Sequence, residues 1–121
     1  MRNELLRDWS SGIVACSYHG ATRIFKGYSS GLWSIFYLHE KGTPYSFWHL
    51  SHNPSGYHFP WKFQQVKSIL QFICDIEDAF PWSNLTRRRL AAQLWQSRLD
   101  EIYFISEALW AHATADEWLP F

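Results

Sequence analysis

The chain has 121 residues, which is the size of a single domain. Hydrophobic residues make up 47% of it and charged residues 18%, and this apolar content excludes disordered, collagen-like and low-complexity proteins. Eleven basic and eleven acidic side chains give a net charge of zero, so the overall charge does not support nucleic-acid binding.

The first residues of the chain carry charges and lack the apolar core of a signal peptide. No uncharged run approaches the roughly 18 residues that a membrane-spanning helix needs. The two cysteines, Cys16 and Cys74, are too few for a disulfide framework. We therefore expect a cytoplasmic protein that does not enter a membrane and has free, buried thiols, although a single bridge is left open.

Residues 2–9 predict a short helix with Leu5, Leu6 and Trp9 on one side, ended by Gly12. From there to about residue 60, all six glycines and three of the five prolines divide the chain into apolar runs. Such runs, rich in β-branched and aromatic residues, predict an antiparallel meander of three to five strands. The expected strands are 13–18, 22–26, 32–40 and 45–50, with a turn at 27–31. Because the third run is apolar on both faces, it predicts a central strand that is covered on both sides.

After Pro60 there is no further glycine, and apolar residues recur at helical spacing. A first helix is expected from Pro60, since proline is tolerated at the first helical position, to Pro81, which enforces the stop. A second helix is expected from about Thr86 to about Ala113, with Ser83 or Thr86 as its N-cap. Its length of roughly 40 Å would exceed the sheet that it covers, so a kink or a projecting end is expected.

The predicted architecture is α+β in one domain that spans residues 1–121. An antiparallel β-meander in residues 12–60 packs against a helical hairpin in residues 60–113, because either half alone would leave too much apolar surface exposed. The tail, residues 114–121, is apolar enough that it should dock on its own core or on another chain.

Two charge clusters flank the expected turn between the helices. They are Arg87, Arg88 and Arg89 at the start of the second helix and Asp75, Glu77 and Asp78 at the end of the first. Each cluster lies at the helix end that its charge disfavours, so a hairpin that brings the two together would neutralise both. We expect at least one ion pair between the clusters; the alternative is that the arginines contact phosphates of a nucleic acid.

The second helix has an unusual distribution of side chains around its axis. Arg98 falls in the middle of the apolar half, so it should either pair with a carboxylate such as Glu4, Asp8 or Glu40 or face a partner. The opposite half carries large aromatic residues that a solvated face does not favour. We expect this helix and the tail to form a partner-binding or self-associating surface. Its residues are Arg98, Tyr103, Phe104, Trp110, Trp118 and Phe121.

His49, His52 and His58 have a spacing that weakly suggests a metal site. A strand does not place residues i and i+3 on one face, so structural or surface histidines are the favoured interpretation and no metal is expected. The nucleotide-binding, hydrolase and metalloprotease motifs are absent from the sequence, and Cys16 with His19 would point to opposite faces of a strand.

Eight tryptophans are more than one core of this size can bury with every indole N–H satisfied, so several should be partly exposed. Exposed Trp, Tyr and Arg are enriched at protein interfaces. The sequence therefore favours a non-enzymatic protein-binding module without a cofactor, such as an adaptor or a small inhibitor. Size alone suggests an accessory protein of a phage or mobile element that inhibits a host defence. The alternatives are a nucleic-acid-binding protein and, third, a small enzyme or metalloprotein.

Overall fold

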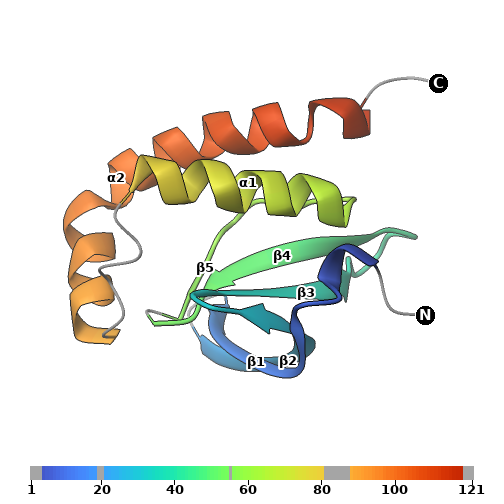
Figure 1. The fold of residues 1–121 in the computed structure, drawn as a ribbon, viewed down its shortest axis with the longest axis horizontal. Helices are drawn as coiled ribbons and strands as arrows, with labels where there is room; N and C mark the ends of the chain where they lie inside the picture. The colour runs from blue at the N-terminus through green and yellow to red at the C-terminus, as the bar shows by residue number, and fades with distance from the viewer. Residues whose placement is uncertain (1–3, 19–20, 55, 81–87, 119–121) are drawn as a thin grey trace.

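The computed structural model describes residues 4–18, 21–54, 56–80 and 88–118, and the side chains of all of these except 17–18, 88–99 and 118. It confirms the α+β class, with a five-stranded sheet followed by two long helices (Figure 1). The elements in chain order are η1 (Glu4–Leu6), β1 (Ser10–Tyr18), β2 (Ala21–Ser30), β3 (Trp33–His39), β4 (Ser46–His52), β5 (Tyr57–His58), α1 (Val66–Ala79), α2 (Arg88–Ala113) and η3 (Ala115–Trp118).

The strands form a closed barrel in the order β1-β2-β3-β4-β5. Each strand pairs antiparallel with the next along the chain, as the meander prediction requires. A single parallel pair, Ser17 with Tyr57, joins β1 to β5 and closes the barrel. This closure was not expected from the sequence, because it depends on one contact between residues far apart in the chain.

β3 is a central strand with both faces covered, as predicted. Trp33 and Ile35 face the helices and belong to the main hydrophobic core. Phe36, on the opposite face, packs with Val14 and Cys16 of β1 in a second, smaller cluster inside the barrel. Successive residues of a strand point to opposite faces, so β3 contributes side chains to both hydrophobic clusters.

The helices lie together along one side of the barrel, and α1 runs between α2 and the strands (Figure 1). Ile69, Phe72 and Ile76 of α1 are fully buried, as the helical spacing predicts. Trp33 of β3 donates a hydrogen bond from its indole Nε1 to Glu77 Oε1 at 2.6 Å, which connects the sheet to the end of α1. α2 bends sharply in Figure 1, in agreement with the expected kink.

The first helix begins later than the sequence suggests. Pro60 is not its first residue, because α1 starts at Val66 and the preceding stretch runs extended beside β4. There Phe63 forms an antiparallel bridge with Trp48, in which the two residues exchange backbone hydrogen bonds of 2.7 and 3.0 Å. Pro81, expected to end the helix, lies outside the described residues, and α1 ends at Ala79.

A carboxylate from the far end of the chain caps α1. The N-cap residue Gln65 makes no capping bond with its own side chain. Glu117 of η3 instead accepts hydrogen bonds from the backbone N–H groups of Gln64 and Gln65, at 2.8 and 3.2 Å. A buried carboxylate at this position satisfies donors that a helix leaves unpaired and interacts favourably with the positive end of the helix dipole.

We expect Glu117→Gln to lower the free energy of unfolding by about 1–2 kcal/mol, because the amide loses the charge and one accepting oxygen. The matched control is Asp116→Asn, which changes the neighbouring, exposed carboxylate and should change stability by less than about 0.5 kcal/mol. Urea denaturation followed by far-ultraviolet circular dichroism measures both. Equal losses in the two variants would contradict the assigned cap.

Three further expectations need correction. The segment at 27–31 is only partly a turn, because β2 continues through Gly27 to Ser30. The N-terminal helix is the short 3-10 helix η1, with Leu6 in the core, and β1 begins before Gly12. Cys74 is exposed rather than buried, while Cys16 is buried, and both thiols are free. The expected N-caps Ser83 and Thr86 lie outside the described residues.

None of the helices in the described part of the chain combines the length and the apolar character needed to cross a membrane.

Candidate binding surfaces

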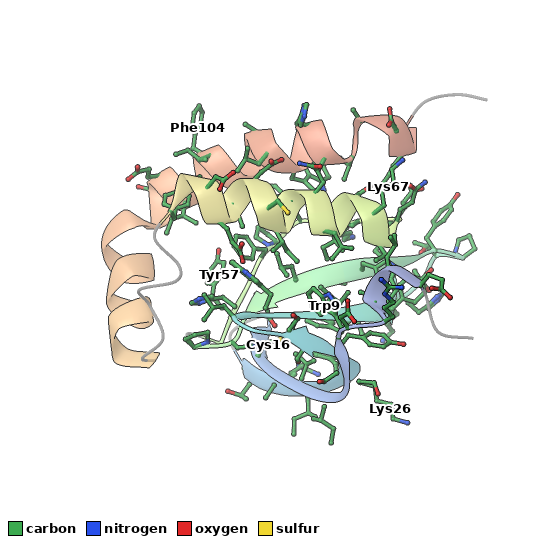
Figure 2. The ribbon with its side chains drawn as sticks, viewed as in Figure 1. Trp9, Cys16, Lys26, Tyr57, Lys67 and Phe104 are labelled. Carbon is green, nitrogen blue, oxygen red and sulfur yellow. The ribbon has the colours of Figure 1, made fainter. Side chains whose placement is uncertain are left out.

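The aromatic residues in the middle of α2 face solvent. Phe104 is 77% exposed and Tyr103 is 48% exposed. Figure 2 shows the Phe104 side chain directed away from the rest of the molecule. The positions of Tyr103 and Phe104 agree with the expectation from the helical wheel. Their role in partner binding remains a prediction.

Trp110 belongs to the same predicted surface, but its side chain packs within the fold. Its ring stacks on Trp61, with centroids 5.3 Å apart and planes within 20°. Its Nε1 donates a hydrogen bond to the backbone oxygen of Lys62 at 2.7 Å. Trp61 in turn donates from its own Nε1 to Ser106 Oγ at 2.8 Å. The two tryptophans therefore stabilise the packing of α2 on the segment that connects the barrel with α1.

The remaining predicted partner-binding residues lie where the structure describes no side chain. The backbone places Arg98 within α2 and Trp118 at the end of η3, and Phe121 lies outside the described residues. Arg88 and Arg89 begin α2, again with only their backbone described, and Arg87 lies outside. Their place on a common surface with Phe104 therefore stays a prediction.

The predicted charge compensation also stays a prediction, because no arginine side chain of the cluster is described. Two of the acidic residues have other interactions, one within α1 and one with β3. Asp75 accepts a hydrogen bond from Gln71 Nε2 at 3.0 Å, one helical turn earlier, and Glu77 accepts the bond from Trp33. Glu77 thus stabilises the contact between helix and sheet.

Trp110→Ala and Phe104→Ala separate folding from binding on α2. We expect Trp110→Ala to lower the free energy of unfolding by about 2 kcal/mol, since it removes a half-buried ring and a hydrogen bond. Phe104→Ala should change stability by less than about 0.5 kcal/mol, since its ring is in solvent. Thermal melting of both variants measures the change in stability, and sedimentation measures whether either variant changes the association state of the protein. A loss in Phe104→Ala as large as that in Trp110→Ala would show that Phe104 serves the fold.

The three candidate metal-binding histidines, two on β4 and one on β5, lie on opposite faces of the sheet. His49 contacts His58 through a hydrogen bond of 3.1 Å between Nδ1 and Nε2, inside the barrel beside Phe36. His52 lies on the helix side, where its ring packs on Trp33 with centroids 5.2 Å apart. Among the described residues there is no group of three side chains suited to hold a metal ion.

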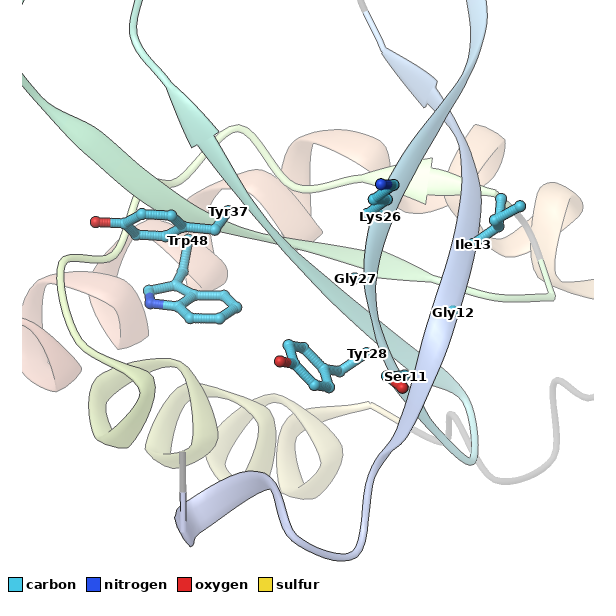
Figure 3. Close-up of a pocket in the computed structure, with 8 residues that line it drawn as sticks. All are labelled: Ser11, Gly12, Ile13, Lys26, Gly27, Tyr28, Tyr37 and Trp48. Atoms are coloured by element: carbon cyan, nitrogen blue, oxygen red, sulfur yellow. The ribbon is translucent and has the colours of Figure 1, made fainter. Parts of the chain in front are cut away.

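A groove with a volume of about 470 Å³ lies on the part of the barrel surface that the helices leave open (Figure 3). We call it the sheet groove. Its lining includes Ile13, Lys26, Gly27, Tyr28, Tyr37 and Trp48. Trp48 is at the centre of the aromatic side, with ring centroids 5.0 Å from Tyr37 and 6.3 Å from Tyr28. Neither the Trp48 indole N–H nor the Tyr37 hydroxyl donates to another group in the described part of the chain.

The groove exists because β2 and β3 separate. Their pairing ends at Gly27 with Phe36, so the next residues of each strand, Lys26 and Tyr37, do not pair with each other. Figure 3 shows the two strands diverging from this point, with Lys26 and Tyr37 on opposite sides. The strands cross so closely that a Cβ on Gly27 would lie 2.2 Å from the backbone oxygen of Ile35.

The groove was not predicted from the sequence because Gly27 and Tyr28 were assigned to a turn. A signal was present in the alternation of large residues, since Ile24, Lys26 and Tyr28 lie at every second position and so on one face of a continuous strand. A glycine inside a strand marks a close approach of another backbone as often as a break.

The chain matches no protein-family model, and no curated protein or solved structure matches it.

Proposed function

We propose that this protein is a non-enzymatic protein-binding module and that the sheet groove is its principal binding site. The observation that carries the proposal is the open groove of about 470 Å³ with three adjacent aromatic rings from three strands. An adaptor and a small inhibitor would both use such a site, by covering a surface of another protein.

The chemistry of the groove suits a protein partner. Tyr and Trp combine a large apolar surface with a polar end, and they dominate the binding energy of protein interfaces. The side chains at the rim are unusually exposed for their type, with Ile13 at 75% and Tyr37 at 53%. Lys26 is the only charged residue of the lining, so most of the contact would be apolar.

The test is co-precipitation from a lysate of the source cells with three variants of the purified protein. Tyr37→Lys places a charge in the groove, Phe104→Lys changes the exposed surface of α2, and Tyr45→Lys changes an equally exposed tyrosine outside the groove lining. We expect Tyr37→Lys to lose the captured protein and Tyr45→Lys to retain it. A central aromatic typically contributes a factor of about thirty to binding.

Other outcomes decide against the proposal. If only Phe104→Lys loses the captured protein, the binding site is on α2 and the assignment of the sheet groove as the binding site is wrong. If the captured material is nucleic acid and its binding falls steeply with salt, the protein-binding function itself is wrong.

A further inference from the structure

The first half of β2 has a strand partner on one side only. All of residues 21–29 pair with β1, whereas pairing with β3 is confined to residues 27–30. Within the described residues, no other strand pairs with β2. Residues 21–26 therefore extend past the part of β2 that closes the barrel with β3, and their side away from β1 pairs with no described strand. We call this side the β2 edge.

An open edge presents backbone N–H and C=O groups that a further strand can bind. The β2 edge leads directly into the sheet groove, because both begin where β2 and β3 separate (Figure 3). A strand added there would occupy the place that β3 leaves after Phe36. Its alternate side chains would face the groove, where Tyr37 and Trp48 supply an apolar surface.

The charge on this hairpin determines which strand fits. Arg23 and Lys26 are the only charged residues of β1 and β2, and both are exposed. Neither forms an ion pair with a described residue. A second copy of this chain would bring two such cationic edges together, and like charges on neighbouring strands destabilise their pairing. An acidic strand would be attracted instead.

We infer that the β2 edge binds an acidic, extended segment of another protein as an additional strand, with an apolar side chain of that segment in the sheet groove. The inference rests on the proposed protein-binding function and specifies the partner. Backbone hydrogen bonds to the edge supply affinity, and the groove and the two cations supply selectivity.

The experiment uses short peptides and the full chain. The probe is a fluorescein-labelled peptide of eight alternating glutamate and valine residues, with binding measured by fluorescence anisotropy. One comparison peptide has lysine for every glutamate. Two others are the acidic peptide N-methylated at one or at the other alternate set of backbone nitrogens. N-methylation removes hydrogen-bond donors from the peptide without any change to the protein.

We expect the acidic peptide to bind and to shift the backbone amide resonances of residues 21–26. N-methylation on the bonding edge should weaken binding about tenfold or more, through the lost hydrogen bonds. Arg23 lies three residues before Lys26 and so on the face of β2 opposite the groove, where the glutamates of the added strand would lie. Arg23→Glu should therefore weaken binding of the acidic peptide and allow binding of the lysine peptide. Lys67→Glu, an exposed lysine on α1 on the helical side of the molecule (Figure 2), should leave both unchanged.

The inference is overturned if the acidic peptide does not bind, if the lysine peptide binds wild type equally well, or if N-methylation weakens binding at neither of the two alternate sets of nitrogens. Resonance shifts confined to α2 would overturn it as well. These failures are distinguishable from failure of the proposed function. If Tyr37→Lys loses the captured protein while no acidic peptide binds, the groove binds proteins but strand addition is wrong.

Discussion

Gly27→Ala is expected to lower the free energy of unfolding by at least about 3 kcal/mol, or to prevent folding. The added Cβ would lie 2.2 Å from the backbone oxygen of Ile35 and 3.0 Å from the Val14 side chain. A backbone carbonyl within the β2–β3 ladder cannot move without loss of pairing, so the strands must separate. The clash is therefore more costly than one with a flexible side chain.

Gly12→Ala is the matched control, because Gly12 is the residue paired with Gly27 across the β1–β2 hairpin. A Cβ on Gly12 would meet no atom within 4 Å. We expect this variant to be neutral or slightly more stable, since alanine has less freedom than glycine in the unfolded chain. Urea denaturation of the two variants measures the difference. Similar stabilities would contradict the close approach at Gly27.

The second large expected effect is a loss of stability at acid pH that results from the burial of His52. This side chain is fully buried at the end of β4, and burial lowers its pKa from 6.5 to about 4. Between these values the unfolded state binds a proton that the folded state excludes, so the free energy of unfolding falls as the pH falls from 6.5 to 4. The full difference amounts to roughly 3 kcal/mol. Above pH 6.5 the residue is neutral in both states and has no effect.

His52→Gln should remove this part of the pH dependence, because glutamine does not titrate. His112→Gln, at an exposed position of α2, should retain the wild-type slope. Denaturant titrations at pH 7, 6, 5 and 4.5 give the change of the free energy of unfolding with pH for each protein. Because the three proteins have the same carboxylates, a difference between their slopes reports only the substituted histidine. A wild-type slope in His52→Gln would show that other groups account for the acid sensitivity.

The strong apolar patterns were sufficient to predict the helices and the strand order. Ile69 and Ile76 recur at helical spacing, and both are buried where α1 meets the sheet. The alternation of β4 likewise placed His49 and His52 on opposite faces. These features depend on neighbours within a few residues, which is the range in which a pattern is informative.

Features that depend on distant residues were missed. The backbone N–H groups just before Val66 bond to the carboxylate of Glu117, which lies 53 residues after Gln64. Barrel closure depends on one pair, Ser17 with Tyr57. Neither contact leaves a periodic trace in the sequence, so local reasoning placed the helix start at Pro60.

For the candidate site, the sequence indicated exposed aromatics but could not assign each one. The wheel of α2 placed Phe104 and Trp110 on the same unusual half, yet Phe104 is in solvent and Trp110 stacks on Trp61. Phe104 and Trp110 differ because the extended segment before α1, which was not predicted, places Trp61 against Trp110. The sheet groove was missed for a related reason, since Gly27 was interpreted as a break between strands.

The contact between Glu117 and α1 also sets an order of events during synthesis. A ribosome adds about 5–20 residues per second, so residue 117 follows residue 64 by roughly 3–10 s. Throughout that interval the first turn of α1 lacks its carboxylate, although every strand of the barrel has already been made. A released chain that ends at residue 116 should therefore hold the barrel beside an α1 whose start is frayed, and proteases should cut that start faster than in the full chain.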